Sequence, residues 1–559
     1  MPSADDEAPM LSADGSIDAL LAGRTRGQLE RAIQRFLPGR RWYAGKARVI
    51  RSVSVVDALP ITGTRPAVPA RVLIVRVEFT EGEAETYSVV ASVMEGERAD
   101  YLLADSPRSV IARLPRRTGE TAVLVDALVD PDVCRELLEA VRRRRTLKGQ
   151  NGGRLLGKPT PALRRVLGTQ DSPEPSIFRA EQSNTSVLFG QSLILKLFRR
   201  VEAGVNPDLE LGRYLTDRAG FPNTPTVAGS LEYAPNGGDP ATLAILHDFV
   251  PNEGDAWQYT LDALSLFYES VVTERIQNGT AAPEAGRRGL LERALRPVPE
   301  EAEELVGSYL QSAQLMGRRV AEMHAAFAAE TIDPGLVPEP FTPHYQRSVY
   351  QSMRNLSGRA MQLLRGSLDR LGPRERADAE EVLGSERELL DRFAAITRAP
   401  LAAMRIRCHG DLHLGQMLFT GRDFMIIDFE GEPARSLSDR RVKRSPLRDV
   451  AGLLRSFHYA TFTALLDQSA RGLVEPDSDA ARELELWGRA WNDAVSSAFL
   501  GAYLEASGRG PWIPESRADL NVLLDTSLLE KAVYELTYEL NNRPLWVPIA
   551  LMGLRDLLD

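Results

Sequence analysis

The sequence predicts an α+β protein in which a strand-rich part of about 250 residues precedes a mainly helical part. Short apolar, β-branched runs bounded by turn residues recur between residues 53 and 250, as expected of strands. Segments with apolar residues at helical spacing follow, at 300–329, 345–371 and 373–397.

The composition narrows the class of protein. The chain has 559 residues, of which 43% are hydrophobic and 26% charged, as in soluble globular proteins of two to four domains. The net charge of -9 predicts no general affinity for nucleic acid or for anionic membranes. Two cysteines cannot make a disulfide framework, and no apolar run approaches the ~20 residues of a membrane helix. Since the acidic N-terminus also lacks signal-peptide features, we expect a cytoplasmic protein.

The N-terminal region is predicted to form a tail and a cap. Residues 1–15 are small and acidic, which favours a disordered tail. Residues 16–128 are expected to form an α+β cap domain that begins with one amphipathic helix from Ile17 to Phe36. Five strands are predicted to follow, at Val53–Leu59, Ala70–Phe79, Thr86–Val93, Ser109–Leu114 and Thr121–Leu128, with a hairpin turn at Glu81-Gly82-Glu83.

Residues 129–250 are predicted to hold a helix and then a second group of strands. The helix, from Asp130 to Arg145, ends in four arginines without interleaved aromatic residues, so we interpret it as a solvated helix end. A later hairpin returns along a strand that carries Lys196 between two leucines. Asn206-Pro207 is a helix-start signal, and it places Glu210 where it could pair with Lys196.

Residues 251–559 are predicted to be mainly helical. The Ala-, Pro- and Arg-rich stretch 279–299 is expected to be a surface insertion, and His324 a structural residue. In the closing helix, Leu529, Val533, Leu536 and Leu540 form a core stripe. Lys531, Tyr534, Glu535 and Tyr538 lie on the opposite face, which suits either a solvated surface or a neutral sugar.

The most informative stretch runs from His409 to Asp428. Asp411 is followed five residues later by Gln416, and Asp428 ends a short apolar strand seventeen residues after Asp411. Kinase-like phosphotransferases use this order of catalytic-loop carboxylate, amide, strand and carboxylate. Carboxylate and amide oxygens suit Mg²⁺, so Gln416 and Asp428 are predicted metal ligands, while Asp411 accepts a proton from the acceptor. A loop of polar turn residues is the alternative, and the combined spacing disfavours it.

This stretch also carries a resemblance. His409 to Gln416, with Ile427-Asp428-Phe429-Glu430, resembles the aminoglycoside/choline kinase-like superfamily. The continuations 431–435 and 443–452, with Arg41-Trp42-Tyr43-Ala44-Gly45-Lys46, are similar to the bacterial maltokinases, which occur alone or fused to trehalose synthase. The resemblance implies a protein-kinase-like bilobal fold with a small lobe within 129–250 and a large lobe at 251–559. It implies phosphorylation of maltose at its anomeric hydroxyl, with ATP and Mg²⁺.

The resemblance also implies binding residues. For the nucleotide they are Gln182, Ser183, Asn184, Thr185, Ser186, Lys196, Glu210, Asp248 and Val250. For the sugar they are His413, Glu430, Lys531, Tyr534, Glu535, Tyr538 and Trp546. Asp449, which opens the helix after the motif, is expected to brace the catalytic loop.

Two alternatives remain open at this point. A glucosamine kinase would share the scaffold, but a free amine would favour a carboxylate pair at the acceptor site. A non-catalytic scaffold for trehalose synthase would not need Lys196, Asp411, Gln416 and Asp428 together. Maltose or a related small sugar is therefore the expected partner, with trehalose synthase as a second one.

Overall fold

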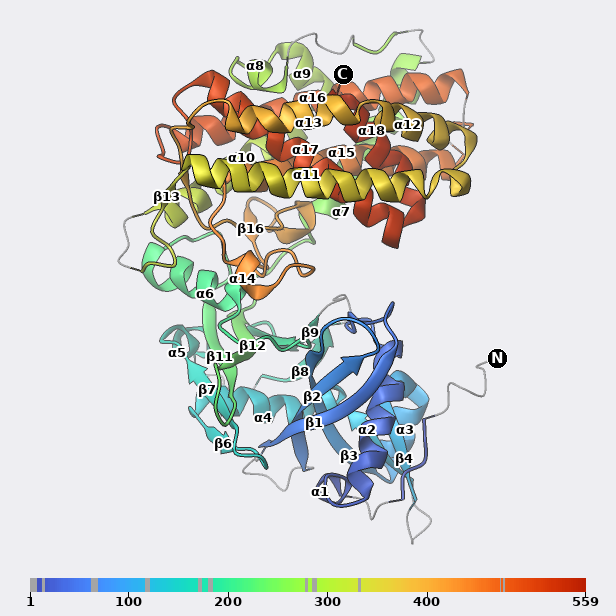
Figure 1. Cartoon of the computed structure of the whole chain (residues 1–559), viewed down its shortest axis with the longest axis vertical. Helices are drawn as coiled ribbons and strands as arrows, with labels where there is room; N and C mark the ends of the chain where they lie inside the picture. Colours follow the sequence, from blue (N-terminus) through green and yellow to red (C-terminus); the bar gives the residue numbers. More distant parts are fainter. Residues whose placement is uncertain are drawn as a thin grey trace. The chain divides into compact units, whose positions relative to one another are not determined.

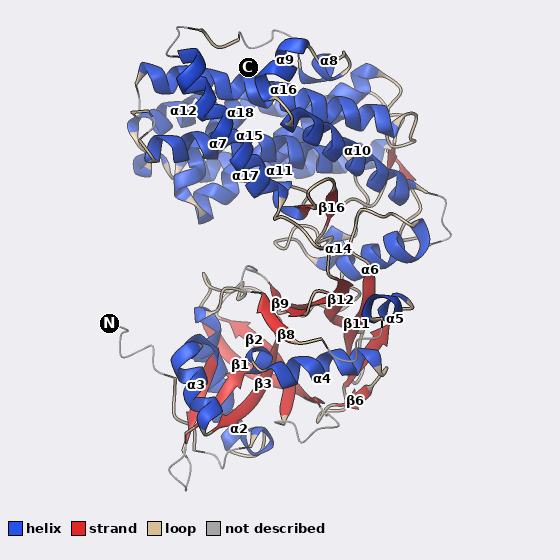
Figure 2. Ribbon diagram, turned by 180° about the vertical axis from the view of Figure 1, so that it is seen from behind, coloured by secondary structure: helices blue, strands red, loops and turns tan. Residues whose placement is uncertain are grey.

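The computed structural model describes two compact units. The described residues are 8–12, 16–61, 69–115, 121–168, 173–178, 184–276, 280–283, 289–329, 333–472, 474–475 and 478–558. Met1–Thr216 and Pro225–Pro251 form the first unit, and Asp217–Thr224 and Asn252–Asp559 form the second. The two large sheets belong to the first unit and most of the long helices to the second (Figures 1 and 2), so the predicted α+β class is confirmed.

The cap is built on a five-stranded antiparallel sheet. Its strands are β1 (Ile50–Ile61), β2 (Ala70–Phe79), β3 (Glu85–Glu95), β4 (Val110–Leu114) and β5 (Ala122–Asp126), in the order β1-β2-β3-β5-β4. Gly82, with φ +86°, lies in the predicted turn between β2 and β3. Helix α3 (Glu97–Asp105), which follows β3, was missed.

The single helix expected over residues 17–36 is wrong. The structure has α1 (Ile17–Leu20) and α2 (Thr25–Phe36), and Gly23 between them adopts φ +52°. A glycine reaches this left-handed conformation without steric cost, and the conformation ends a helix. The apolar spacing continues across the break because both helices pack on the same core.

The two faces of the cap sheet bury different cores. Leu29 and Ile33 of α2 pack with Leu73 and Val75 on one face. On the other face Val72, Val90 and Val125 share a continuous core with α4 (Pro131–Arg142) and with β9 and β10. The cap and the strands of the small lobe are therefore parts of one packed unit.

Three of the four arginines at the end of α4 pair with acids of that helix. Arg142 and Arg143 pair with Glu139 at 2.8 and 2.6 Å, and Arg145 pairs with Glu136 at 3.0 Å. These partners agree with the interpretation of the run as a helix end and not as a nucleic-acid surface.

The second sheet of this unit is seven-stranded and antiparallel. Its order is β6 (Thr146–Lys148), β7 (Arg154–Pro159), β11 (Val227–Ala234), β12 (Ala241–Asp248), β10 (Leu193–Phe198), β9 (Asn184–Phe189) and β8 (Pro175–Phe178). In β10, Lys196 lies opposite Ser186 of β9 and Ile245 of β12. Helix α5 (Ala162–Leu167) follows β7, and α6 (Pro207–Tyr214) begins as predicted, with Asn206 capping the backbone N–H of Asp208 at 2.9 Å.

The second unit is a helical assembly with two small hairpins. Its longer helices are α7 (Ala256–Ser270), α10 (Tyr309–Ala328), α11 (Pro343–Arg365), α12 (Pro373–Gly384), α15 (Leu447–Ala470), α16 (Asp479–Ser507), α17 (Arg517–Asn542) and α18 (Val547–Leu558). β15 (Met417–Phe419) pairs with β16 (Phe424–Ile426), which is the strand predicted before Asp428. Asn223 joins this unit by accepting a hydrogen bond from the Ile426 N–H at 2.8 Å.

Two predicted helices and the predicted surface insertion need correction. The helix expected over 300–329 is divided into α9 (Glu300–Val306) and α10, because Gly307 adopts φ +66°. The helix expected over 373–397 is divided at Ser385, after which α13 (Glu386–Ala394) begins. The stretch expected to be a surface insertion contains α8 (Leu290–Ala294), whose Leu291 is buried and whose Arg293 pairs with Asp493 of α16 at 3.0 Å.

The expectations from composition concern the helices and the two cysteines. Within the described ranges, no helix combines the length and the apolar character that crossing a membrane requires. Cys134 and Cys408 are both buried as free thiols, and burial raises the pKa of Cys134 to about 12, so neither is a reactive surface thiol.

Candidate active site

Asp449 holds the backbone of the loop that carries Asp411. Its carboxylate accepts hydrogen bonds from the N–H groups of His409 at 2.8 Å and Gly410 at 2.9 Å. The ring of His324 lies 3.0 Å from the same carboxylate and 3.0 Å from the Tyr503 hydroxyl. Burial acts against ionisation of Asp449, but these hydrogen bonds hold its pKa below the usual value. Both predictions, of a loop brace and of a structural His324, are confirmed.

His409 ties the loop to the end of β16, a role that the sequence reasoning missed. Its Nε2 lies 2.8 Å from the carbonyl oxygen of Ile427, and its Nδ1 lies 3.4 Å from the N–H of Asp411. A neutral ring that donates from Nε2 and accepts at Nδ1 satisfies both contacts. The positions of Asp411 and Asp428 are therefore linked through one buried imidazole.

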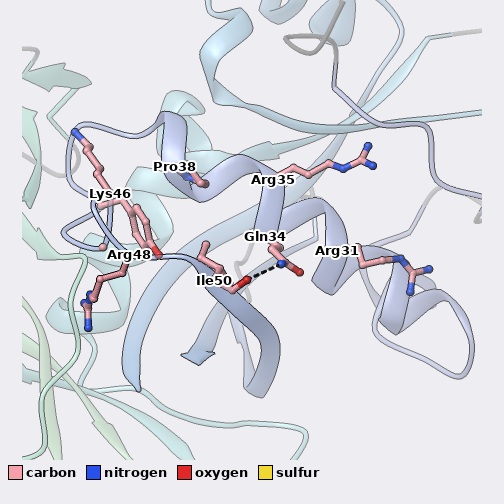
Figure 3. A pocket seen from close by; sticks show the side chains of 9 residues that line it. Arg31, Gln34, Arg35, Pro38, Lys46, Arg48 and Ile50 are labelled. Atoms are coloured by element: carbon pink, nitrogen blue, oxygen red, sulfur yellow. Dashed lines mark hydrogen bonds between the residues drawn. The ribbon is translucent and has the colours of Figure 1, made fainter. Parts of the chain in front are cut away.

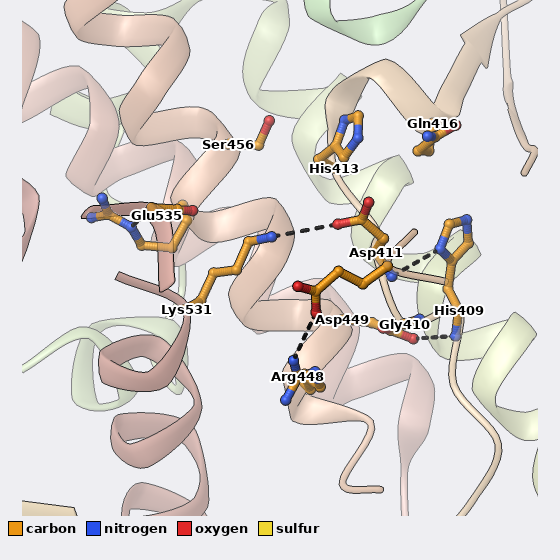
Figure 4. A network of polar contacts seen from close by, with 12 residues as sticks. His409, Gly410, Asp411, His413, Gln416, Arg448, Asp449, Ser456, Lys531 and Glu535 are labelled. Carbon is orange, nitrogen blue, oxygen red and sulfur yellow. Dashed lines mark hydrogen bonds and ion pairs between the residues drawn. The ribbon is translucent and has the colours of Figure 1, made fainter. Parts of the chain in front are cut away.

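Asp411 faces Lys531 of α17. The Lys531 ammonium lies 3.5 Å from an oxygen of Asp411, and both side chains are about one quarter exposed or less. Figure 4 shows Lys531 pointing toward Asp411, with His413 on the same loop. Burial lowers the pKa of His413, so this ring is neutral, and its Nδ1 accepts from the Gly415 N–H. Two of the sequence-predicted residues, Asp411 and Lys531, thus meet across two elements.

Gln416 and Asp428 converge at the end of the β15–β16 hairpin. The Gln416 amide nitrogen lies 3.2 Å from a carboxylate oxygen of Asp428. Oxygens of Asp428 and Glu430 lie within 4.8 Å of each other. Asp428 has φ +66°, a conformation that costs energy for a non-glycine residue and is found at functional sites. These hard oxygen donors fit Mg²⁺, which Gln416 and Asp428 would hold and which would neutralise phosphate charge there.

The pocket beside Asp411 is small and highly charged. It is lined by Gly410, Asp411, Leu412, Glu432, Arg448, Asp449, Gly452, Ser527, Glu530, Lys531 and Tyr534. Its volume of about 20 Å³ holds about one water molecule and not a sugar ring. The pocket in this conformation therefore does not admit the neutral sugar that the sequence predicts.

The carboxylates behind this pocket are already paired. Glu530 binds Arg448 at 2.7 Å, and Glu432 binds Arg435 at 2.6 Å. Burial opposes ionisation of Glu530, but Arg448 and its neighbours hold its pKa below the usual value. The Tyr534 hydroxyl donates a hydrogen bond to the carboxylate of Glu432. Sequence reasoning missed Glu432, Arg448 and Glu530, because a charge on a helix gives no sign that a distant partner covers it.

Glu535, Tyr538 and Trp546, the other residues predicted to bind the acceptor, differ in their exposure and in their partners. Glu535, expected on an open face, is bound to Arg455 at 2.8 Å, and both side chains are largely buried. The prediction that Glu535 is an open group, free to bind sugar hydroxyls, is therefore corrected: the ion pair with Arg455 sets the position of its carboxylate. Tyr538 is 42% exposed and stacks on Tyr534. Trp546 stacks between Trp257 and Tyr459, so it forms part of an aromatic cluster.

In the first unit, Lys196 pairs with Asp208 at the start of α6. The ammonium lies 3.1 Å from the Asp208 carboxylate, and both residues are buried. The sequence predicts Glu210 as a partner of Lys196, and Glu210 lies two residues further along the same helix. Asn184, Thr185 and Ser186 form the start of β9, whereas Gln182 and Ser183 lie outside the described residues.

The end of β12 carries Asp248 and leads to Val250. A carboxylate oxygen of Asp248 accepts the Thr226 N–H, and burial raises the pKa of Asp248. This contact fixes the chain just after the strand.

Arg199, three residues after Lys196, joins the cap to the β9–β10 hairpin. It is 2% exposed, pairs with Asp126 at 2.7 Å and donates to the Thr185 hydroxyl at 2.8 Å. Its guanidinium also lies 4.7 Å from the ring centroid of Trp42. The sequence reasoning missed this residue, because an arginine at a strand end usually reaches solvent.

The fold and the arrangement of Asp411, Gln416 and Asp428 are those expected of the kinase-like phosphotransferases. Residues 36–130 match the family described as Maltokinase N-terminal cap domain. Over about 390 residues the chain is 27% identical to the glucosamine kinase of Streptacidiphilus jiangxiensis and 24% identical to that of Mycolicibacterium smegmatis. These alignments cover 68% of this chain, and 72% and 78% of the two relatives.

Solved structures agree on the fold. A glucosamine kinase in complex with glucosamine, ADP and inorganic phosphate matches with a TM-score of 0.58 at 18% identity, over 94% of this chain and 99% of that one. The chain therefore combines a maltokinase-type N-terminal cap with a protein-kinase-like fold, as the resemblance in its sequence predicted.

Proposed function

We propose that this chain is an ATP-dependent sugar kinase that phosphorylates maltose at its anomeric hydroxyl. The observation that carries the proposal is the pair of Asp411 and Lys531, with Asp428 and Gln416 on the same unit. Asp411 would take the proton of the attacking hydroxyl. Lys531 would orient that hydroxyl and the Asp411 carboxylate toward each other. Lys196, fixed by Asp208, would bind the phosphates of ATP.

The charges near Asp411 favour a neutral acceptor. Lys531 would repel the ammonium group of an amine substrate. At a separation of 4 Å the repulsion is about 1 kcal/mol in bulk water and about 4 kcal/mol at the effective dielectric constant near a protein surface. Glu432 and Glu530 are paired with arginines, so neither supplies an uncompensated carboxylate for an amine. These two features support maltose. The names of the relatives support glucosamine as the second candidate.

A substrate panel tests both candidates. ADP release should be fastest with maltose among maltose, glucose, glucosamine, choline and kanamycin, and ³¹P NMR should identify a 1-phosphate. Preference for glucosamine, or a 6-phosphate product, would refute maltose as the substrate but would leave the proposal of a sugar kinase intact. Absence of ADP release with every sugar would refute the kinase itself.

Lys531 supplies a sharper comparison. Lys531→Met should lower the overall rate and also narrow the preference for maltose over glucosamine by about tenfold, since the repulsion of the amine is removed. Arg517→Met, at the exposed start of the same helix, is the matched control and should leave the preference unchanged.

A further inference from the structure

The cap carries a dense positive patch that the kinase proposal does not use. Residues 23–52 contain nine arginines or lysines and one acidic residue, although the whole chain has a net charge of -9. The acidic residue, Glu30, is already occupied, because it pairs with Arg26 at 3.2 Å and accepts the Val55 N–H at 3.0 Å. The patch therefore keeps an excess of positive charge on a protein that is otherwise acidic.

Part of this patch surrounds a pocket of about 450 Å³. Its lining residues are Arg31, Gln34, Arg35, Pro38, Tyr43, Gly45, Lys46, Arg48 and Ile50. Figure 3 shows Arg31, Gln34 and Arg35 on one helix, α2, and Lys46 and Arg48 on the segment that leads into β1. The Gln34 amide donates to the Ile50 carbonyl at 3.4 Å and joins the two sides. The volume lies in the usual range for small-molecule sites.

The cations of this pocket are only partly compensated. Arg48 pairs with Glu85 at 2.6 Å, and Lys46 donates to the Arg41 carbonyl at 3.2 Å. In the part of the chain that the structure describes, the side chains of Arg31 and Arg35 make neither a salt bridge nor a hydrogen bond. They are four residues apart on one helix face, where two like charges are mutually unfavourable. An anion bound between Arg31 and Arg35 would relieve that repulsion.

A buried donor lies in the same wall. Tyr43 is 2% exposed, and its hydroxyl has no hydrogen-bond partner among the described residues. Burial raises the pKa of Tyr43 to about 12, so the hydroxyl stays protonated and can donate. A Cβ on Gly45 would lie 2.5 Å from this oxygen, so a glycine is needed for the chain to pass over it.

We propose that this cap pocket binds a small phosphorylated metabolite through Arg31, Arg35, Lys46 and the Tyr43 hydroxyl. Arginine forks bind phosphate oxygens in pairs, and the two sides of the pocket suit a ligand with two separated anionic groups. Arg48 is held by Glu85 and shapes the wall. Glu85 also lies 3.6 Å from Arg200, which follows the strand of Lys196, so the ligand would bind beside a contact of the small lobe.

Isothermal titration of the full chain with fructose 1,6-bisphosphate, in the presence of MgADP, tests the site. We expect one binding event per chain that weakens as salt is added. The double variant R31S/R35S should weaken binding at least tenfold, while R24S/R51S, which removes two exposed arginines outside the pocket, should change it less than twofold. Absence of binding to the wild type, or equal losses in both variants, would overturn the proposal.

The variant Tyr43→Phe distinguishes a role of the Tyr43 hydroxyl in ligand binding from a role in the stability of the fold. The variant should bind the bisphosphate at least threefold more weakly and melt no lower than the wild type, because the hydroxyl has no protein partner to lose. A lower melting temperature with unchanged binding would show that the hydroxyl serves the fold alone. Binding of polyglutamate but not of the bisphosphate would refute a small-molecule site.

Discussion

Asp449→Asn probes how firmly the loop of Asp411 is held. The carboxylate accepts the N–H groups of His409 and Gly410 and contacts His324. An asparagine of the same shape keeps one acceptor oxygen and places an NH₂ donor against one of these groups. A lost hydrogen bond to a charged group costs about 1.5–3 kcal/mol, and an unsatisfied buried donor about 1–3 kcal/mol. We therefore expect the free energy of unfolding to fall by about 3–5 kcal/mol.

The assay follows urea unfolding together with amide hydrogen exchange at His409 and Gly410. Both amides should lose protection in Asp449→Asn, and kcat should fall about 10–100-fold, because Asp411 is no longer held in place. Asp467→Asn, at an exposed position of the same helix, is the control and should stay within about 0.5 kcal/mol of the wild type. If exchange at both amides is unchanged in Asp449→Asn, the brace does not carry the loop and the reasoning fails.

The same residue gives a pH dependence with a defined sign. The folded-state pKa of Asp449 lies below the usual value of an aspartate. A carboxyl group with a depressed folded pKa contributes stability above its unfolded pKa and loses it as the pH falls through the folded value. The difference in unfolding free energy between wild type and Asp449→Asn should therefore be constant from pH 7 to 5 and shrink below pH 4. A difference that grows in acid would contradict this linkage.

The remaining predictions concern the chemistry at the site. Asp411→Asn should bind MgATP normally and turn over about 10²–10⁴-fold more slowly, as single-turnover kinetics would reveal; near wild-type kcat would remove Asp411 from the mechanism. Asp428→Ala should abolish rate saturation by Mg²⁺, and Gln416→Ala should only raise the Mg²⁺ needed, because water can replace a neutral ligand; an unchanged Mg²⁺ titration in Asp428→Ala would refute its assignment. Glu535→Ala should lower stability by about 3–5 kcal/mol as well as raising the sugar KM, since it leaves Arg455 buried without its carboxylate. A raised sugar KM with unchanged stability would instead favour a direct contact between Glu535 and the sugar.

The local parts of the site could be predicted from the sequence, and the partners of buried charges could not. The spacing of Asp411, Gln416 and Asp428 predicted a loop, a strand and a pair of converging side chains, all of which the structure contains. Lys196 pairs with Asp208, although Glu210 also follows the same helix-start signal. The pair with Asp208 was not predicted, because residue spacing along one helix does not encode the angle at which α6 meets the sheet.

Helix breaks and cross-element contacts show the same limit. The apolar pattern runs through Gly23 and Gly307, so only the two positive φ angles reveal that each helix stops there. Glu535 lies on the polar face of α17, but the approach of Arg455 from α15 covers it. A hydrophobic pattern reports burial by apolar neighbours and carries no information on burial by an oppositely charged one.

Arg199 has a consequence for dissecting this protein. A shortened chain that began at Pro131 would lack Asp126 and Trp42, so the guanidinium of Arg199 would lose its carboxylate and its aromatic cover while Thr185 alone remained. It would also open the apolar face that Val72, Val90 and Val125 share with β9 and β10. The cap is therefore not a detachable module: removing it should yield an aggregating fragment, and exchanging it between relatives should succeed only if the residues that surround Arg199 are exchanged with it.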